Sequence, residues 1–181
     1  MGFFDDVPFQ DTHQPRGDPW DPPVAEFPCA VATGPLVLAR TEAVAVAVIG
    51  VWAFKAGVEF WVSARFHHAQ PPAHGDMAPQ ESARIGLQFA DGRKAANFTT
   101  SPEPAERTGP PGLVLSTRGL GGGLRHREWS YWVWPLPPAG PVSFVCEWAA
   151  ADIPEAQARL DAQPILDAAG QSVQLWPEGH H

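Results

Sequence analysis

Apolar and polar residues in the middle of the chain alternate with the period of two that is typical of β-strands. Val44, Val46 and Val48 alternate with alanine and isoleucine, which is the pattern of a strand buried on both faces. After the turn at residues 55–57, the segment 58–66 again places its apolar side chains on one face. These two segments predict a β-hairpin.

An Asp91-Gly92 dipeptide separates two further alternating segments, residues 84–89 and 93–98. Because Asp-Gly is a frequent two-residue hairpin turn, these segments predict a second hairpin. Three more strands are predicted at residues 113–116, 128–134 and 142–148.

The pattern near the C-terminus favours a helix instead. Asp161 is a suitable capping residue, and Pro164 falls at an early helical position, where its missing N–H group costs nothing. Gly170 weakens a helix. We therefore expect a short helix over about residues 163–174.

Together these elements predict a mainly β fold class. About seven to nine short strands with frequent turn signals are typical of a single antiparallel two-sheet β-sandwich. Immunoglobulin-like and jelly-roll-like versions both fit, and the pattern leaves the strand order open. The short helix is expected to cover an edge or an open end of this sandwich.

Composition agrees with one β-rich domain. A chain of 181 residues is within the range that one hydrophobic core serves. The 21 prolines and 17 glycines favour turns over helices. Charged residues make up 18% of the chain, against about 25% in an average domain, while hydrophobic residues make up 44%.

The first 28 residues differ from the rest, since they hold six acids, one base and six prolines. This composition disfavours helices and internal strands, so residues 1–28 are predicted to be an acidic tail, extended or partly disordered, and residues 29–181 the domain. The tail also contains aromatic residues. Docking of the tail on its own domain or on a partner is therefore an alternative.

The net charge of −8 argues against nucleic-acid binding, which needs a basic surface. The N-terminus lacks the basic region and apolar run of a signal peptide, and the longest apolar stretch, residues 43–54, is shorter than the ~20 residues that cross a bilayer. We expect a cytoplasmic protein without membrane contact, in which Cys29 and Cys146 are reduced.

The most distinctive candidate site is an aromatic strand at residues 128–134. Alternation places Trp129 and Tyr131 on one face and Trp132 and Trp134 on the other. One face fills the core, while the other is either covered by the chain itself or presents a binding platform for a sugar, peptide or base.

A second candidate lies in the glycine-rich segment 118–127, which contains Arg118, Arg125, His126 and Arg127. Guanidinium groups and glycine-rich backbone suit a phosphate or carboxylate ligand. The spacing differs from that of a phosphate-binding loop, which has a lysine before a helix. A flexible hairpin loop is the alternative interpretation, and the acidic tail is a further candidate partner.

Metal and catalytic motifs are weak in this sequence. His67, His68 and His74 lie close together, but their spacing matches no known ligand motif, and a solvated loop explains them. Cys146 lies in an apolar strand, where a thiol usually acts as a small apolar residue. We predict no cofactor and no catalytic residue.

Several segments resemble small uncharacterised proteins that are common in high-GC actinobacteria. The segments that carry this resemblance are 131–138 (YWVWPLPP), 144–148 (FVCEW), 153–155, 175–177 and, upstream, 87–95. The resemblance covers roughly residues 34–177. It implies an actinobacterial source and supplies no mechanism.

Three functions remain open from the sequence. The first is a non-enzymatic interaction module that binds an unknown protein partner or a second copy of itself. The second is a small-ligand or carbohydrate-binding domain that uses the strand 128–134, and the third is a hydrolase. An unpaired edge strand would favour the first, an exposed aromatic row the second, and a pocket with a perturbed acid the third.

Overall fold

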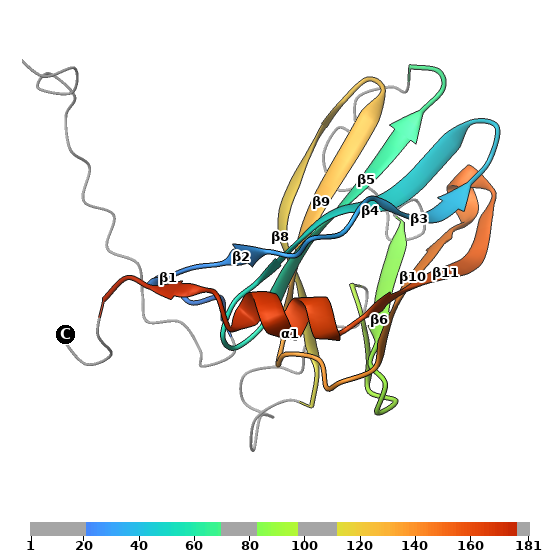
Figure 1. Ribbon diagram of the computed structural model, residues 1–181. Helices are drawn as coiled ribbons and strands as arrows, with labels where there is room; N and C mark the ends of the chain where they lie inside the picture. Colours follow the sequence, from blue (N-terminus) through green and yellow to red (C-terminus); the bar gives the residue numbers. More distant parts are fainter. Residues whose placement is uncertain (1–20, 70–82, 98–111, 177–181) are drawn as a thin grey trace, which may run out of the picture.

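The computed structural model describes residues 21–69, 83–97 and 112–176. It confirms the mainly β fold class, with antiparallel sheets and the helix α1 (Gln163–Ala169) (Figure 1). The strands are divided among three sheets, where the sequence predicted two.

The largest sheet has six strands. They are β2 (Cys29–Ala30), β3 (Leu36–Arg40), β4 (Val44–Ala53), β5 (Val58–Phe66), β8 (Val114–Gly123) and β9 (His126–Trp134). Their order is β2-β4-β5-β9-β8, and β3 also pairs with β4. The predicted hairpin of β4 and β5 is confirmed, with Val46 opposite Ala64.

The second sheet has four strands in the order β11-β10-β6-β7. They are β6 (Arg84–Gln88), β7 (Lys94–Ala96), β10 (Pro141–Trp148) and β11 (Ile153–Asp161). The short 3-10 helix Ala149–Ala151 connects β10 to β11. The predicted hairpin of β6 and β7 is confirmed by their antiparallel pairing.

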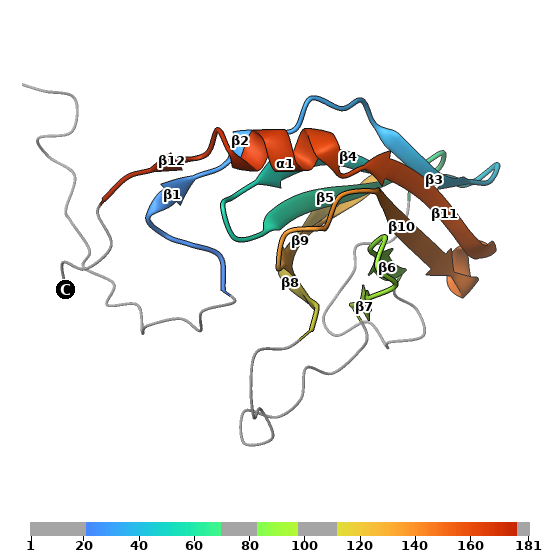
Figure 2. The same ribbon diagram turned by 60° about the horizontal axis from the view of Figure 1, so that its bottom comes forward.

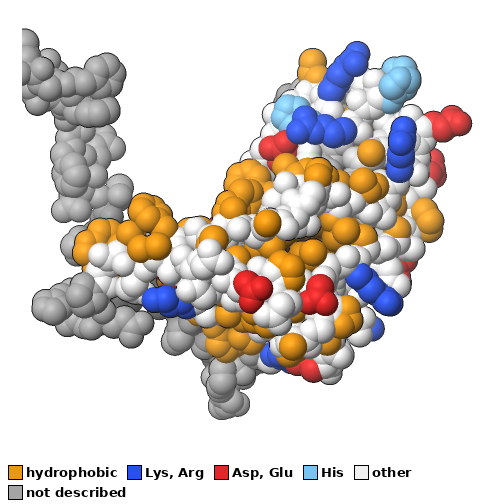
Figure 3. Space-filling view, viewed as in Figure 1, with side chains coloured by type: hydrophobic (Ala, Val, Ile, Leu, Met, Phe, Trp, Pro, Cys, Tyr) orange, Lys and Arg blue, Asp and Glu red, His pale blue; other side chains and the backbone are white. Residues whose placement is uncertain are grey.

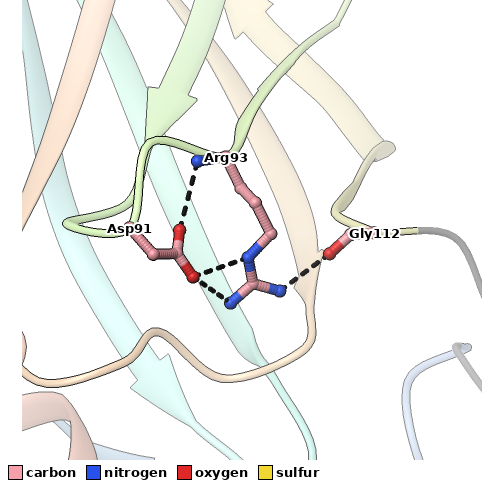
Figure 4. A network of polar contacts seen from close by, with 3 residues as sticks. All are labelled: Asp91, Arg93 and Gly112. Atoms are coloured by element: carbon pink, nitrogen blue, oxygen red, sulfur yellow. Dashed lines mark hydrogen bonds and ion pairs between the residues drawn. The ribbon is translucent and has the colours of Figure 1, made fainter.

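The predicted Asp91-Gly92 turn joins β6 to β7 and is held by side-chain contacts (Figure 4). The Oδ1 atom of Asp91 accepts the backbone N–H of Arg93 at 3.1 Å, and Oδ2 accepts its Nε–H at 2.7 Å. These hydrogen bonds from Arg93 lower the pKa of Asp91. Because the guanidinium also donates to the carbonyl of Gly112 at 2.8 Å, the turn is linked to the chain just before β8.

The core lies between the two larger sheets. Phe60 on β5 stacks on Tyr131 of β9 at 5.2 Å and meets the edge of Phe144 on β10 at 5.1 Å. All three side chains are buried. Burial of each such side chain contributes about 1.5–3 kcal/mol, so the two sheets are held together by apolar contact.

A third, two-stranded sheet lies at one end of the molecule, and α1 lies next to it along β2 and β4 (Figure 2). The N-cap residue is Ala162, one position after the predicted capping residue Asp161. Asp161 still accepts the N–H of Gln163, the first helical residue, at 2.7 Å. The helix ends at Ala169, earlier than predicted, because the following chain forms β12 (Val173–Gln174). β12 pairs with β1 (Glu26–Phe27), so the last residues of the predicted tail belong to a sheet.

Several strands differ from the sequence-based expectation. The predicted strand 113–116 continues as β8 through Gly123, where a flexible glycine-rich loop was the alternative interpretation. No strand was predicted at β11, nor at the short strands β1, β2, β3 and β12. Within the described residues, no helix has the length and apolar character needed to span a membrane.

Candidate functional site

The β8–β9 hairpin carries the predicted arginine-rich segment. Its strands pair from Val114 opposite Trp134 to Gly123 opposite His126, so only Leu124 and Arg125 form the tip. Gly122 has a φ of +155°, and a Cβ there would lie 2.5 Å from the carbonyl oxygen of His126. Glycine is therefore required at this position, and the segment is an ordered hairpin.

The basic residues of this segment differ in their exposure and contacts. Arg118 and Arg125 are exposed, and His126 is half-buried. Arg118 lies at a β-bulge, because the pairing shifts between Thr117 and Gly119. The Arg127 guanidinium instead lies over the rings of Phe66 at 5.6 Å and Trp148 at 6.0 Å, where cation–π attraction holds it.

The hairpin tip belongs to a larger basic end of the molecule. This basic end consists of Arg40, Arg65, His67, Arg125, His126 and Arg127. Figure 3 shows arginine and histidine side chains gathered over the upper end of the molecule. Arg65 forms an ion pair with Glu128 at 3.1 Å. Glu42 lies beside Arg40 and Arg65 at the same end. The four arginines outnumber Glu42 and Glu128, so the end keeps a net positive charge, which favours acidic ligands.

β8 is an edge strand. It ends the order of the six-stranded sheet, and among the described strands only β9 pairs with it. Four of its last five residues are glycines, and Leu120 is 71% exposed. Unpaired backbone groups along such a strand are a template for a strand from another chain.

Trp129 and Tyr131 face the interior. Tyr131 is fully buried on Phe60, and the half-buried Trp129 meets the edge of Trp148 at 6.1 Å. Burial raises the pKa of the Tyr131 hydroxyl, although that hydroxyl accepts a hydrogen bond from Asn97 at 3.3 Å. Tyr131 therefore has a packing role.

Trp132 and Trp134 lie on the opposite face of β9, and both were candidates for a binding platform. Trp132 is fully buried, with its ring edge-to-face with Phe54 at 5.2 Å. Trp134 is half-buried. Since Trp132 has no exposed surface, this residue fits the alternative interpretation, in which the chain covers its own aromatic side chains.

The three histidines that were considered as metal ligands are not all described. His67 and His68 follow one another at the end of β5, with ring centroids 4.3 Å apart, whereas His74 lies outside the described residues. In the part of the chain that the structure describes, no group of three potential ligands comes together.

The two cysteines lie in different sheets, Cys29 on β2 and Cys146 on β10, and both are free thiols. Cys146 is fully buried, and this burial raises the pKa of its thiol to about 11. At neutral pH the thiol is protonated and packed in the core, so it is a poor nucleophile.

A second pair of tryptophans, which was not identified from the sequence, lies on the outer face of the six-stranded sheet. Trp52 on β4 and Trp61 on β5 meet edge-to-face at 6.2 Å, and Trp61 donates from Nε1 to a carboxylate oxygen of Glu59 at 3.0 Å. Trp61 is 36% exposed. In the segment 58–66, Trp61 alternates with the apolar residues that form the buried face. This alternation could have predicted that Trp61 lies on the outer face.

Comparisons with protein-family models, with curated proteins and with solved structures find no match to this chain.

Proposed function

We propose that this protein is a non-enzymatic interaction module that binds an extended acidic segment of a partner protein along the free edge of β8. The observation that carries the proposal is the position of this ten-residue strand at the end of its sheet. A partner strand that pairs with β8 would satisfy backbone hydrogen bonds along its length.

The side chains around β8 support an acidic partner. Arg118 projects from the bulge and Arg125 from the hairpin tip, and both are exposed. Such peripheral charges accelerate association and select against basic partners. The bulge at Arg118 also breaks the regularity of the edge, which disfavours unselective pairing.

Two broader classifications belong to the same proposal. The two larger sheets, with the core between them, support assignment to the β-sandwich class, of the immunoglobulin-like or jelly-roll-like type. A cytoplasmic location is proposed from the same sequence features as above.

The test uses a synthetic peptide in which valine alternates with glutamate, because this probe combines an extended conformation with negative charge. We expect the peptide to bind the full chain, to slow amide exchange in β8, and to bind more weakly as the ionic strength rises. A peptide in which valine alternates with lysine should not bind.

Charge reversal locates the binding surface. The double substitution Arg118→Glu and Arg125→Glu should weaken binding roughly tenfold. Arg159→Glu is the matched control, since Arg159 is exposed on β11 in the other sheet and the affinity should not change. Equal weakening by the control, or binding without added protection in β8, would contradict the proposal. If the protein forms a dimer through β8 in the absence of peptide, the partner at this edge is a second copy of the chain.

A second candidate function is supported by the pair Trp52 and Trp61. A half-exposed tryptophan ring beside a carboxylate is the arrangement that stacks on a sugar ring and binds its hydroxyls. If this site binds carbohydrate, Trp61→Ala should abolish glycan binding, whereas Trp134→Ala should leave it intact.

A further inference from the structure

The outer face of the four-stranded sheet contains an open trough of about 300 Å³. Its floor is one row across the sheet, in which Ala96, Gly86 and Val145 lie side by side. These side chains face outward, because the alternating residues Ile85 and Leu87 are buried in the core. The trough therefore forms because a row of small side chains lies between two rows of long side chains.

Gly86 deepens the floor at the centre of this row. A Cβ atom at this position would lie 3.5 Å from the carbonyl oxygen of Ala95 and 3.7 Å from the Cβ of Val145, and both are ordinary van der Waals distances. Neither crowding nor a positive φ explains this glycine, although glycine weakens a strand. A glycine inside a strand often marks a close approach of a ligand.

The two walls of the trough carry opposite charges. Lys94 and Gln88 face each other across β7 and β6 and form one wall. The other wall contains Glu147 and Glu155. Arg84 forms an ion pair with Glu147 at 3.0 Å. Of the other charged side chains that line the trough, Lys94 and Glu155 have no ion pair among the described residues.

The spacing of these charges sets the length of a matching ligand. Lys94 is on β7 and Glu155 on β11, at opposite edges of the sheet. Three strand spacings separate them by about 14 Å across the sheet, and four residues along the strands add an offset of about 13 Å. The gap between backbones is therefore about 19 Å, and their long side chains shorten it. The amides of Gln88 and Gln157 lie between them, where they match the donors and acceptors of peptide bonds.

We propose that this trough binds a short zwitterionic ligand of the class of free di- and tripeptides, with the ligand carboxylate at Lys94 and its ammonium group at Glu155. A trough of this volume is at the lower end of the range for ligand sites. No aromatic residue lines it among the described residues, so a sugar-stacking ligand is disfavoured. This site is separate from β8 and does not depend on the proposed partner.

Isothermal titration of the full chain with trialanine tests the proposal. N-acetyl-trialanine and trialanine amide each lack one terminal charge, and we expect each to bind about threefold to tenfold more weakly. Gly86→Leu should abolish binding because its side chain fills the trough. Its midpoint of thermal unfolding should be no lower than that of the wild type, since a Cβ fits at this position and glycine weakens a strand.

The two lysines of the chain provide a matched pair for a second test. Lys94→Gln should lower the affinity for trialanine to that of the wild type for trialanine amide. Lys55→Gln, in the β4–β5 turn, should leave the affinity for trialanine unchanged. Absence of saturable binding would overturn the proposal. Equal affinity for trialanine and its two blocked forms would also overturn it. So would unchanged trialanine affinity in both Gly86→Leu and Lys94→Gln. Tighter binding of a neutral disaccharide than of trialanine would overturn the proposed ligand class.

Discussion

At the level of single residues, the tryptophans of this protein differ mainly in their surroundings. Trp132 is fully buried and packs on Phe54, while Trp61 is 36% exposed on the outer face of the same sheet. Both lie on strands with alternating patterns. The alternation predicted the face of Trp132, and it would have given that of Trp61, which was not singled out. Burial depends on which distant residues cover each ring.

Substitution of these two tryptophans should separate a packing role from a surface role. Trp132→Ala removes a buried ring and should lower the free energy of unfolding by about 3–5 kcal/mol. Trp61→Ala should lower it by roughly 1 kcal/mol, because much of its ring already contacts water. Urea denaturation measures both, and equal losses would contradict the burial seen here.

The Cys146 thiol should make stability decrease at alkaline pH. Burial raises its pKa to about 11 in the folded protein, whereas the unfolded thiol ionises near pH ~8.5. The folded state therefore retains a proton that the unfolded state releases. Its stabilising contribution is complete below about pH 8.5 and is lost as the pH rises toward about 11, by roughly 3 kcal/mol.

Urea denaturation across this pH range measures the effect. Cys146→Ala should flatten the decline between about pH 8.5 and 10, while Cys29→Ala, the other free thiol, should leave it unchanged. Above about pH 10 the buried hydroxyl of Tyr131 adds a decline of the same sign, because burial raises its pKa as well. An unchanged slope in Cys146→Ala would refute this assignment.

At the level of elements, the strands with strong alternation were predictable. β5 has its expected bounds, and β9 and β10 begin within two residues of theirs. β4 covers the predicted valine positions and continues to Ala53. β11 was missed because its sequence, IPEAQARLD, is rich in alanine, glutamate and glutamine, which favour helices. Its pairing with β10 over most of its length overrides that local preference.

The candidate sites, like the strands, were predictable where the local sequence carries the signal and not where distant strands form the site. The arginines of β8 and β9 were identified from composition, but their strand conformation was not, because glycines give no apolar alternation to read. The trough at Gly86 could not be predicted from the sequence, because it depends on which strands lie side by side. β7, β6 and β10 bring Ala96, Gly86 and Val145 into one row, and β10 is distant from the other two in sequence.

The small β1–β12 sheet depends on Glu26. This residue is 7% exposed, and its carboxylate accepts the backbone N–H of Lys55 at 2.6 Å. Glu26→Ala leaves that N–H without its partner, so we expect a loss of about 1–3 kcal/mol and faster amide exchange in β1 and β12. Glu42→Ala, in the β3–β4 turn, is the control and should leave exchange there unchanged.

At the level of the whole molecule, charge is unevenly distributed along the chain. The sequence carries 20 acids and 12 lysines and arginines, yet several arginines gather at the basic end. β1 and the β8–β9 hairpin tip lie at opposite ends of the molecule (Figure 1). Residues 1–20 precede β1, and a chain of that length can extend over about 66 Å.

This arrangement predicts that the acidic N-terminal residues compete for the basic end. Deletion of residues 1–20 keeps β1 intact, and it should accelerate amide exchange in residues 118–127 and strengthen binding of the valine–glutamate peptide. Replacing Asp5, Asp6, Asp11 and Asp18 with asparagine should have the same effect, because the attraction is electrostatic, and high ionic strength should abolish the difference. If exchange in residues 118–127 is identical with and without residues 1–20, the N-terminal residues do not bind there, and the basic end serves external ligands alone.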